Sequence, residues 1–419
     1  KLSTFIDKKM NIVDTSLDSY ANYDYSNINN VLSKNNIDNL SNLTYNPIGN
    51  VLLTGVTGFL GAHILDYLIK NTDIKIYCLV RKDPSISLTD KVLNKLHFYF
   101  GNIYDNLINK RIFIINSDLT QDKLGLTDEK LFSISNNISC VINTAAVVKH
   151  YGNYSDFEAI NTTSVRKLIE FCERYNKRLI QISTISVSGN TLADFAVNNN
   201  NFTSSVSFNE NNLYIGQSME NVYVHSKFEA EKNILEEISK GKLNALILRI
   251  GNITNRFSDG KFQFNAKENA FANKIKAFLE ISALPDYILD KYMEFSPVDY
   301  VAEAVVKSIE YFDKNISVLH IFNQNHVYIE NFINLLPKKY KIDIVSDLEF
   351  RNIINNMLKN DEKKYVLSHI LNDLNSDHKL IYDTPIKIEN NFSQAFFHKI
   401  GFSWPIITKK YIENLIKNI

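Results

Sequence analysis

The sequence predicts an α/β fold, in which a doubly wound parallel sheet is followed by a smaller, mainly helical C-terminal domain. Between residues 50 and 250, short apolar segments alternate with segments of helical pattern. The apolar segments are continuous, as expected for strands whose two faces are both covered by helices. A chain that alternates strand and helix forms a parallel sheet with right-handed crossover connections.

The elements follow one another in a regular order up to residue 250. Strands are predicted at 50–54, 74–80, 111–115, 139–143, 178–182 and 244–248, and helices near 60–70, 89–98, 155–176 and 225–240. The segment 190–217 is polar and rich in Asn, and it is long for a connection between a strand and a helix. We expect this segment to run over the surface or close to a functional site.

Helical patterns dominate after residue 250, with a few short strands between them. The predicted helices are 265–281, 298–312, 345–372, 391–398 and 405–417. We therefore predict a linker or docking segment over 1–48, a sheet domain over 49–250 and a second domain over 251–419, some of whose elements return to the sheet. The first segment is rich in Asn, Ser and Tyr and contains a short helical pattern in SNINNVLSKN.

The composition argues against several classes of protein. Basic and acidic residues number 46 each, so the formal net charge is zero, whereas a nucleic-acid-binding protein normally has a basic surplus. No apolar segment reaches the roughly 18 residues that span a bilayer, and the start lacks the pattern of a secretion signal. Cys78, Cys140 and Cys172 lie far apart in apolar segments, which favours buried side chains in a reducing compartment. We expect a cytoplasmic protein without a metal site, cut from a longer chain because it begins at Lys1.

The most informative segment is NVLLTGVTGFLGAH, at 50–63. Its apolar run leads into three spaced glycines, and a helical pattern begins directly after them. Glycines allow a tight turn and the close approach of a pyrophosphate, whose charge then lies at the positive end of the helix. The segment predicts a dinucleotide site, with an ordinary structural turn as the alternative. The predicted contacts are Gly55, Thr57, Gly58, Phe59, Leu60 and Gly61.

Three further residues suggest carbonyl chemistry. Tyr223 and Lys227 are one helical turn apart in NVYVHSKFEAE, so they share a face of a predicted helix. An ammonium beside a phenol lowers the pKa of the phenol, which suits a tyrosine that donates a proton to a carbonyl oxygen. An ordinary surface pair is the alternative. Thr184 follows the strand 178–182, at the end where such sheets bind ligands, although hydroxyl residues are common there.

In this order, the glycine loop, Thr184, Tyr223 and Lys227 resemble the extended short-chain dehydrogenase/reductase superfamily, with the last three in the positions of its catalytic triad. The superfamily has a Rossmann-type sheet. The chain is similar in particular to the terminal thioester reductase domains of nonribosomal peptide synthetases, relatives of the reductase part of carboxylic acid reductases. The matching segments, from about residue 50 to about 415, include CLVRK, INTAAVVKHYG, QISTISVSG, YVHSKFEAE, LRIGNITNRFSDGKFQFN, EFSPVDYVAEAV and HKIGFSWPIITKKYIENL. Plain sugar-nucleotide epimerases lack the segment LRIGNITNRFSDGKFQFN.

The resemblance implies NADPH as the cofactor. Arg81 follows the second strand, where an acidic residue would bind the ribose hydroxyls of NAD, and its guanidinium suits the 2′-phosphate of NADP. Lys91 falls where the family carries a second basic residue for that phosphate. Solvated surface charges are the alternative for both residues.

Segments that follow other strands complete the expected cofactor site. Asp118 and Leu119, past the third strand, match the family's adenine contact. Ala145 and Ala146, past the fourth strand, are small enough for the backbone to lie against a ribose. Lys149 is expected to approach the nicotinamide.

The resemblance also implies a reaction and a partner. A peptidyl or aminoacyl thioester on the phosphopantetheine of an upstream carrier domain would be reduced by NADPH to an aldehyde, and possibly further to an alcohol. Tyr223 would protonate the oxyanion, Thr184 would hydrogen-bond to it and Lys227 would hold the nicotinamide ribose. The alternatives are a free-standing enzyme acting on a nucleotide sugar or other small carbonyl, and a non-catalytic NADP-binding module. We expect the excised domain to be a monomer.

Overall fold

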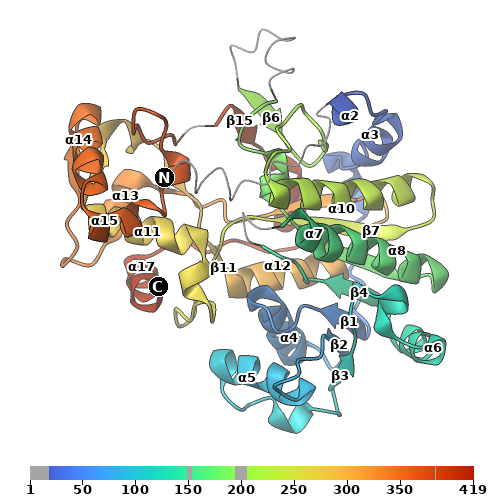
Figure 1. Ribbon diagram of the computed structural model, residues 1–419. Helices are drawn as coiled ribbons and strands as arrows, with labels where there is room; N and C mark the ends of the chain where they lie inside the picture. Colours follow the sequence, from blue (N-terminus) through green and yellow to red (C-terminus); the bar gives the residue numbers. More distant parts are fainter. Residues whose placement is uncertain (1–17, 149–152, 194–204, 383) are drawn as a thin grey trace. The chain divides into compact units, whose positions relative to one another are not determined.

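A computed structural model describes residues 18–148, 153–193, 205–382 and 384–419 (Figure 1). The chain divides into two compact units. The first, the sheet unit, comprises Lys1–Gly251, Val301–Ile321 and Pro385–Ser403, and the second, the C-terminal unit, comprises Asn252–Tyr300, Phe322–Thr384 and Trp404–Ile419. Two segments beyond residue 250 therefore belong to the sheet unit.

The sheet unit is built on a seven-stranded parallel sheet with the order β12-β7-β5-β4-β1-β2-β3. Its strands are β1 (Val51–Thr54), β2 (Ile76–Val80), β3 (Ile112–Asn116), β4 (Cys140–Asn143), β5 (Arg178–Thr184), β7 (Asn244–Ile250) and β12 (Val318–Ile321). This sheet confirms the predicted doubly wound α/β fold. The strand order reverses between β1 and β4, and ligands bind at the carboxyl ends of strands at such a point.

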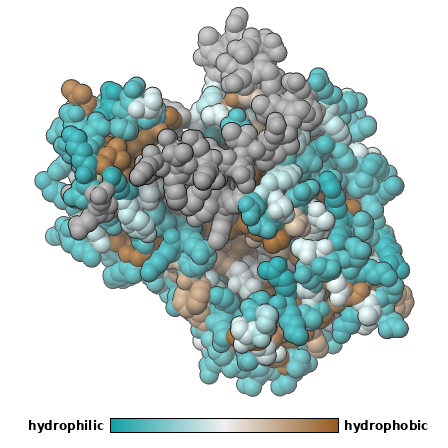
Figure 2. All heavy atoms as spheres, viewed as in Figure 1, coloured by the Kyte–Doolittle hydropathy of each residue, from teal (hydrophilic) through white to brown (hydrophobic). Residues whose placement is uncertain are grey.

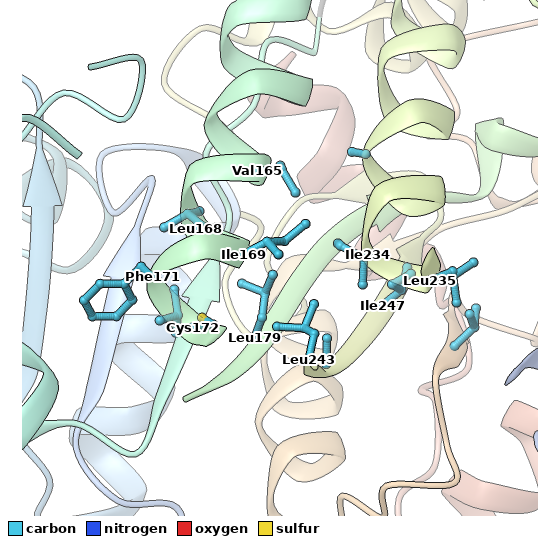
Figure 3. Packing of buried hydrophobic residues seen from close by; sticks show 14 of the residues in the cluster. Val165, Leu168, Ile169, Phe171, Cys172, Leu179, Ile234, Leu235, Leu243 and Ile247 are labelled. Atoms are coloured by element: carbon cyan, nitrogen blue, oxygen red, sulfur yellow. The ribbon is translucent and has the colours of Figure 1, made fainter. Parts of the chain in front are cut away.

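Most helices of the sheet unit lie close to their predicted positions. They are α4 (Phe59–Asn71), α5 (Leu88–Phe100), α6 (Asp128–Asn137), α7 (Tyr154–Phe157), α8 (Ser164–Arg174), α10 (Val222–Ser239), most of α12 (Val298–Glu310) and α16 (Asn391–Lys399). The sequence did not predict α6, and a π-helical turn, Glu158–Thr163, divides the helix predicted at 155–176. Apolar side chains of α8 and α10, such as Ile169 and Ile234, cluster over β5 and β7 (Figure 3).

Residues 18–48 pack on the rest of the sheet unit. α3 (Ser26–Leu32) contacts α10, and Ile28 and Leu32 belong to the same buried cluster as the side chains of α10. The buried Asn35 side chain accepts a hydrogen bond from Ser317 N at 2.9 Å and donates one to the carbonyl oxygen of Glu210 at 3.1 Å. The short helix predicted in SNINNVLSKN is α3, and this part of the chain belongs to the core of the unit.

The segment 190–217 is described at its two ends, since residues 194–204 lie outside the described residues. Near its second end, β6 (Val206–Phe208) pairs in parallel with β15 (Ile386–Ile388). Gln217 Nε2 then donates to the carbonyl oxygens of Val187 at 2.9 Å and Leu213 at 2.8 Å. These contacts return the chain to the body of the unit just before α10.

The C-terminal unit is mainly helical, as predicted for the second domain. Its helices are α11 (Ala270–Ile281), α13 (Ile329–Leu335), α14 (Asp347–Leu358), α15 (Asp361–Leu367) and α17 (Lys409–Asn418). Its short strand pairs are β8 (Ile253–Thr254) with β11 (Ser296–Pro297), β9 (Ala283–Pro285) with β14 (Asp343–Val345), and β10 (Tyr292–Met293) with β13 (Val327–Tyr328). The single helix predicted at 345–372 is two helices, because Lys359 N and Asn360 N bond back to Asn356 and Met357 and close α14.

Hydrophilic residues cover most of the face of the molecule in Figure 2. In the described part of the chain, no helix is both long and apolar enough to cross a membrane. Cys78, Cys140 and Cys172 are buried free thiols, which confirms the prediction of buried side chains.

Candidate functional site

Glycines shape the loop that follows β1. Gly55 has a φ of +71°, and a Cβ there would lie 2.4 Å from Thr144 Oγ1. A Cβ on Gly61 would lie 2.3 Å from the carbonyl oxygen of Gly55. Gly55 therefore has a left-handed backbone and no room for a side chain beside Thr144, and α4 approaches the loop closely only because Gly61 has no side chain.

The start of α4 forms a cradle that fits a phosphate group. Gly58 is the N-cap residue of α4, and it has no side chain that could accept from the first N–H groups of the helix. Leu60 is buried and anchors this turn, whereas Thr57 and Phe59 are partly exposed. Helix N-termini attract anions through these N–H groups and the helix dipole. The structure thus brings together the residues predicted for the glycine loop.

A buried polar ladder fixes the carboxyl ends of the central strands. Thr54 Oγ1 donates to Asn143 Oδ1 at 2.5 Å, and Asn143 Nδ2 donates to Gln181 Oε1 at 2.8 Å. Thr144 Oγ1 donates to the carbonyl oxygen of Thr54 at 2.7 Å and joins the loops after β1 and β4. Sequence reasoning missed this ladder, although the available signal was a polar residue at the end of β1 and of β4 and a glutamine inside the apolar run of β5.

Thr184 and Tyr223 meet at the carboxyl end of β5. The Thr184 hydroxyl hydrogen-bonds the Tyr223 side chain. The N–H of Ser186 donates to Thr184 Oγ1 at 3.1 Å, so the proton of that hydroxyl is available to the phenol oxygen. Both side chains are buried. The fold therefore joins two predicted site residues from distant parts of the sequence.

An N-cap places Tyr223 in the first turn of α10. The side-chain oxygen of Asn221 accepts from Tyr223 N at 3.0 Å and from Val224 N at 3.2 Å. The helix therefore begins at Val222, earlier than the predicted 225, because an Asn cap satisfies its first N–H groups.

Lys227 lies one turn after Tyr223 and is held against β5. Its Nζ donates to the carbonyl oxygen of Ile182 at 3.0 Å, and the side chain is buried. Burial lowers the pKa of Lys227 to about 8, although the Glu231 carboxylate favours the ammonium form. The three candidate catalytic residues thus lie on two adjoining elements, β5 and α10.

The expected lowering of the Tyr223 pKa is wrong for this structure. Burial raises the pKa of Tyr223 to about 12, and the hydrogen bond from Thr184 offsets only part of this effect. The ammonium of Lys227 is meanwhile bonded to the Ile182 carbonyl. Tyr223 is therefore a neutral phenol near neutral pH, which is the form that can donate a proton.

The π-helical turn connects the loop after β4 to α10. Asn161 in this turn accepts from Val147 N at 2.8 Å and donates to Val147 O at 2.9 Å. The same amide donates to Ser226 Oγ at 3.0 Å, between Tyr223 and Lys227 on α10. Asn161 is another residue that sequence reasoning missed, since its role depends on a π-turn within a predicted regular helix.

Arg81, Lys91 and Asp118 gather at the ends of β2 and β3. Arg81 is exposed, and Lys91 Nζ donates to its carbonyl oxygen at 2.9 Å. Burial alone would raise the pKa of Asp118, but hydrogen bonds from Thr120 and the charge of Arg81 hold it below its ordinary value. Lys91 thus braces the backbone of Arg81, and its own ammonium is engaged by that carbonyl.

The remaining predicted contacts lie past the ends of β3 and β4. Leu119, Ala145 and Ala146 are partly buried there, and Ala145 N donates to Thr54 Oγ1 at 3.3 Å. Lys149 lies outside the described residues. The cradle at Gly55 and Gly61, with small residues beside it, fits a nicotinamide dinucleotide.

Residues 53–305 match the protein family described as Male sterility protein, an NAD-binding family. The matched residues are more than half of the chain. They include the glycine loop, Thr184, Tyr223 and Lys227, so the match contains the whole candidate site.

The chain is also similar to probable polyketide synthases of Dictyostelium discoideum. It is 27% identical to probable polyketide synthase 14 over 401 residues, which cover 89% of this chain and 13% of that protein. It is 31% identical to probable polyketide synthase 44 over 195 residues, which cover 46% of this chain and 6% of that protein. The chain thus spans only a small part of the length of these relatives.

Two solved structures resemble the fold over nearly its whole length. A thiolation-reductase di-domain from an archaeal nonribosomal peptide synthetase is 30% identical with a TM-score of 0.82, covering 97% of this chain and 82% of that one. The reductase domain of the aureusimine biosynthetic cluster is 24% identical with a TM-score of 0.73, covering 94% and 97% of the two chains. The chain belongs to the Male sterility protein family and to the reductase domains of the extended short-chain dehydrogenase/reductase superfamily, and it is an NAD(P)-dependent oxidoreductase.

Proposed function

We propose that this chain uses NADPH to reduce a thioester carried on the phosphopantetheine of a carrier domain and releases the acyl group as an aldehyde. The observation that carries the proposal is the meeting of the Thr184 hydroxyl with the Tyr223 phenol at the end of β5. Two adjacent hydroxyl groups can both donate hydrogen bonds to the oxygen of a substrate carbonyl as that oxygen gains negative charge. Lys227 lies one turn away on the same helix.

Each of the three residues has a distinct task in the proposed reaction. Tyr223, a neutral phenol, donates its proton to the oxygen of the thioester carbonyl as that oxygen becomes an oxyanion. Thr184 donates a hydrogen bond to the same oxygen. Lys227 binds the nicotinamide ribose, and its positive charge stabilises the phenolate that Tyr223 becomes.

The cofactor, when bound, supplies a hydride to the carbonyl carbon. The balanced reaction consumes a thioester, NADPH and a proton, and it yields an aldehyde, a thiol and NADP⁺. A second turn on the aldehyde would give an alcohol. The chain's own residues bind, orient and protonate the substrate.

The preference for NADPH over NADH is assigned to Arg81. Its exposed guanidinium follows β2, at the place where a dinucleotide-binding sheet meets the adenosine ribose. A planar guanidinium matches the oxygens of a 2′-phosphate. Lys91 contributes by bracing Arg81, and Asp118 and Leu119 are assigned to the adenine.

The rest of the cofactor has its own assigned contacts. The pyrophosphate is assigned to the cradle of Gly55 and Gly61, and the ribose to Ala145 and Ala146. Lys149 is assigned to the nicotinamide. The start of α4 supports the first of these assignments, because its N-cap residue Gly58 makes no side-chain cap to the first N–H groups of the helix.

The similarity to known proteins supports a carrier domain as the partner. The archaeal structure joins a thiolation domain to a reductase domain, and the curated relatives are probable polyketide synthases. We therefore propose that the partner is an upstream carrier domain loaded with an acyl or peptidyl chain. We also propose a cytoplasmic location and a monomeric reductase. The C-terminal unit is proposed to bind the substrate chain.

The test is a reaction with NADPH and a short acyl thioester of pantetheine. We expect NADPH oxidation that requires the thioester, with trapped aldehyde in equal amount, and a much slower reaction with NADH. Conversion of a nucleotide sugar without net NADPH oxidation would instead support an epimerase. Cofactor binding without turnover of the thioester would support a non-catalytic module.

A further inference from the structure

A fully buried ion pair lies one helical turn beyond Lys227. Arg249 Nη2 lies 2.7 Å from Glu231 Oε2, and both side chains are 0% exposed. Arg249 Nε donates to the two carboxylate oxygens at 3.2 and 3.0 Å. Two nitrogens of the guanidinium therefore hold one carboxylate, which fixes the position of both side chains.

Arg249 interrupts the otherwise apolar interior of β7, and its other contacts are also buried in the sheet unit. Its Nη2 donates to the carbonyl oxygen of Asn212 at 2.8 Å, and its Nη1 donates to that of Asn209 at 3.3 Å. These two carbonyls belong to the segment that returns the chain to α10. Arg249 thus ties that segment to the ion pair.

A neutral histidine completes the surroundings of Arg249. Because arginine only donates, Nε2 of His320 accepts from Arg249 Nη1 at 3.3 Å, and Nδ1 donates to the carbonyl oxygen of Glu389 at 3.0 Å. Burial and the charge of Arg249 hold the pKa of His320 well below its ordinary range. His320 therefore adds no positive charge beside the ion pair.

Glu231 connects this cluster to the candidate catalytic residues by two routes. Ser183 Oγ donates to Glu231 Oε1 at 2.5 Å, and Ser183 directly precedes Thr184 on β5. On α10, Glu231 lies one turn after Lys227, and its carboxylate favours the ammonium form of that lysine. One carboxylate thus acts on the end of β5 and on Lys227.

Other charged groups on or beside α10 lie in further places, and one of them, Glu236, accepts a hydrogen bond from the Tyr23 hydroxyl at 2.6 Å. A cavity of about 350 Å³ is lined by Tyr20, Tyr23, Tyr154, Glu158, Arg166, His225, Glu229 and Lys232. Toward the end of α10, Glu173 of α8 lies beside Glu237, which pairs with Lys240. Tyr223, Glu231 and the strand β5 lie beside Lys227 itself. Arg249 pairs with Glu231, and its charge also favours the carboxylate form of Glu210.

Fold stability alone gives little reason for a buried ion pair. The desolvation of two charges offsets much of their attraction, and well-packed apolar side chains of similar volume stabilise a core as well or better. Burial by itself disfavours the charge of Lys227. A fixed carboxylate one turn away counteracts this effect, and a fixed carboxylate in the core needs a partner such as Arg249.

We propose that Glu231, held in place by Arg249, is a positioning residue of the reductase site: it holds a carboxylate one helical turn from Lys227 and fixes the strand end at Thr184 through Ser183. The inference rests on the proposed function, in which the ammonium of Lys227 binds the ribose and stabilises the phenolate of Tyr223. Without the carboxylate, Lys227 loses its proton at a lower pH.

The test compares the pH dependence of kcat for the wild type and Glu231→Gln, which removes the charge and keeps the volume. The alkaline limb, where Lys227 loses its proton, is expected to move to lower pH by about one unit or more. Glu231→Asp keeps the charge, so the alkaline limb of its kcat profile is expected at the same pH as in the wild type. Glu237→Gln, a matched loss of a carboxylate on the same helix, is expected to leave the limb unchanged.

A limb that stays in place in Glu231→Gln, with a uniform loss of rate at every pH, would overturn the proposal, because a merely structural role predicts that result. The single variant leaves Arg249 buried without its partner and can fail to fold. The double variant Glu231→Gln/Arg249→Met then decides: a limb displaced to lower pH supports the proposal, and an unmoved limb rejects it.

A second readout does not need turnover. The titration of the Lys227 ammonium, followed by NMR in the protein without cofactor, is expected to move to lower pH in Glu231→Gln and to stay in place in Glu237→Gln. A wild-type chain that fails to reduce the thioester would refute the proposed function, whereas an unmoved lysine titration would refute the role of Glu231.

Discussion

Lys227 Nζ donates a 3.0 Å hydrogen bond to the carbonyl oxygen of Ile182, on the strand that ends at Thr184. This contact joins α10 to β5, so Thr184, Tyr223 and Lys227 are positioned by one pair of packed elements. Gln181 Nε2 donates to the same carbonyl at 2.9 Å. The carbonyl would therefore keep a hydrogen-bond partner if the lysine were replaced.

We predict that Lys227→Met stabilises the fold near neutral pH while it abolishes activity. The pKa of Lys227 falls from 10.5 to about 8 on folding, so the buried charge costs on the order of 3 kcal/mol below pH 8. The free energy of unfolding in urea should rise by about that amount at pH 7.

The advantage of Lys227→Met should depend on pH. As the pH rises through about 8 toward 10.5, the folded wild type carries fewer protons than its unfolded form and gains stability, so the difference closes. Lys240→Met, at an exposed lysine that pairs with Glu237, is the control and should change little. A Lys227→Met protein that is less stable than the wild type at pH 7 would contradict this prediction.

Tyr223→Phe tests the proton donor. The phenol hydroxyl is lost while the buried ring remains, so NADPH binding should be close to that of the wild type. Turnover should fall by about two or more orders of magnitude, the scale of general-acid catalysis. Stopped-flow oxidation of NADPH measures the loss, and a rate near the wild-type value would remove Tyr223 from the mechanism.

Gly61→Ala tests the cradle at the start of α4. Its Cβ would lie 2.3 Å from the carbonyl oxygen of Gly55, whereas the Cβ of Gly58→Ala would lie 3.1 Å from the same atom. We expect Gly61→Ala to lose about 1–3 kcal/mol of stability through overpacking and to bind NADPH about tenfold or more weakly. Fluorescence titration and thermal unfolding measure both effects. Equal losses in the two variants would show that the close approach at Gly61 is not decisive.

Arg81→Ala tests the choice of cofactor. The loss of charged hydrogen bonds to the 2′-phosphate, about 1.5–3 kcal/mol, should weaken NADPH binding by about 10- to 100-fold and leave NADH binding nearly unchanged. Lys82→Ala, at the exposed neighbouring lysine, is the matched control. A similar loss for both cofactors would mean that Arg81 does not contact the phosphate.

Local signals in the sequence were enough to predict most of the sheet. The apolar runs and the glycine spacing depend only on neighbouring residues, and they placed six of the seven strands and the loop at Gly55. β12 was missed although Val318–Ile321 is a short apolar run like the others, because it follows the helical patterns beyond residue 250 and joins the sheet only by pairing with the distant β7. The π-turn at Asn161 likewise depends on contacts with distant Val147 and Ser226.

The candidate site was predictable as a set of residues but not as an electrostatic environment. The spacing of Tyr223 and Lys227 is local, whereas the pKa of Tyr223 depends on burial among Phe157, Val222 and neighbouring side chains. The ion pair of Glu231 and Arg249 joins a helix to a strand. A lone arginine in the apolar run of β7 was the one signal for it, and the sequence did not identify its partner.

The most direct measurement is a single-turnover reaction of the chain with NADPH and an acyl thioester loaded on the phosphopantetheine of a carrier domain. The aldehyde, the freed carrier thiol and NADP⁺ are quantified together. We expect equal amounts of all three from the wild type, formed about a hundredfold or more slowly by Tyr223→Phe. Release of the acyl group as an acid without NADPH oxidation, or bound cofactor with no release at all, would contradict the assignment of this chain as a thioester reductase.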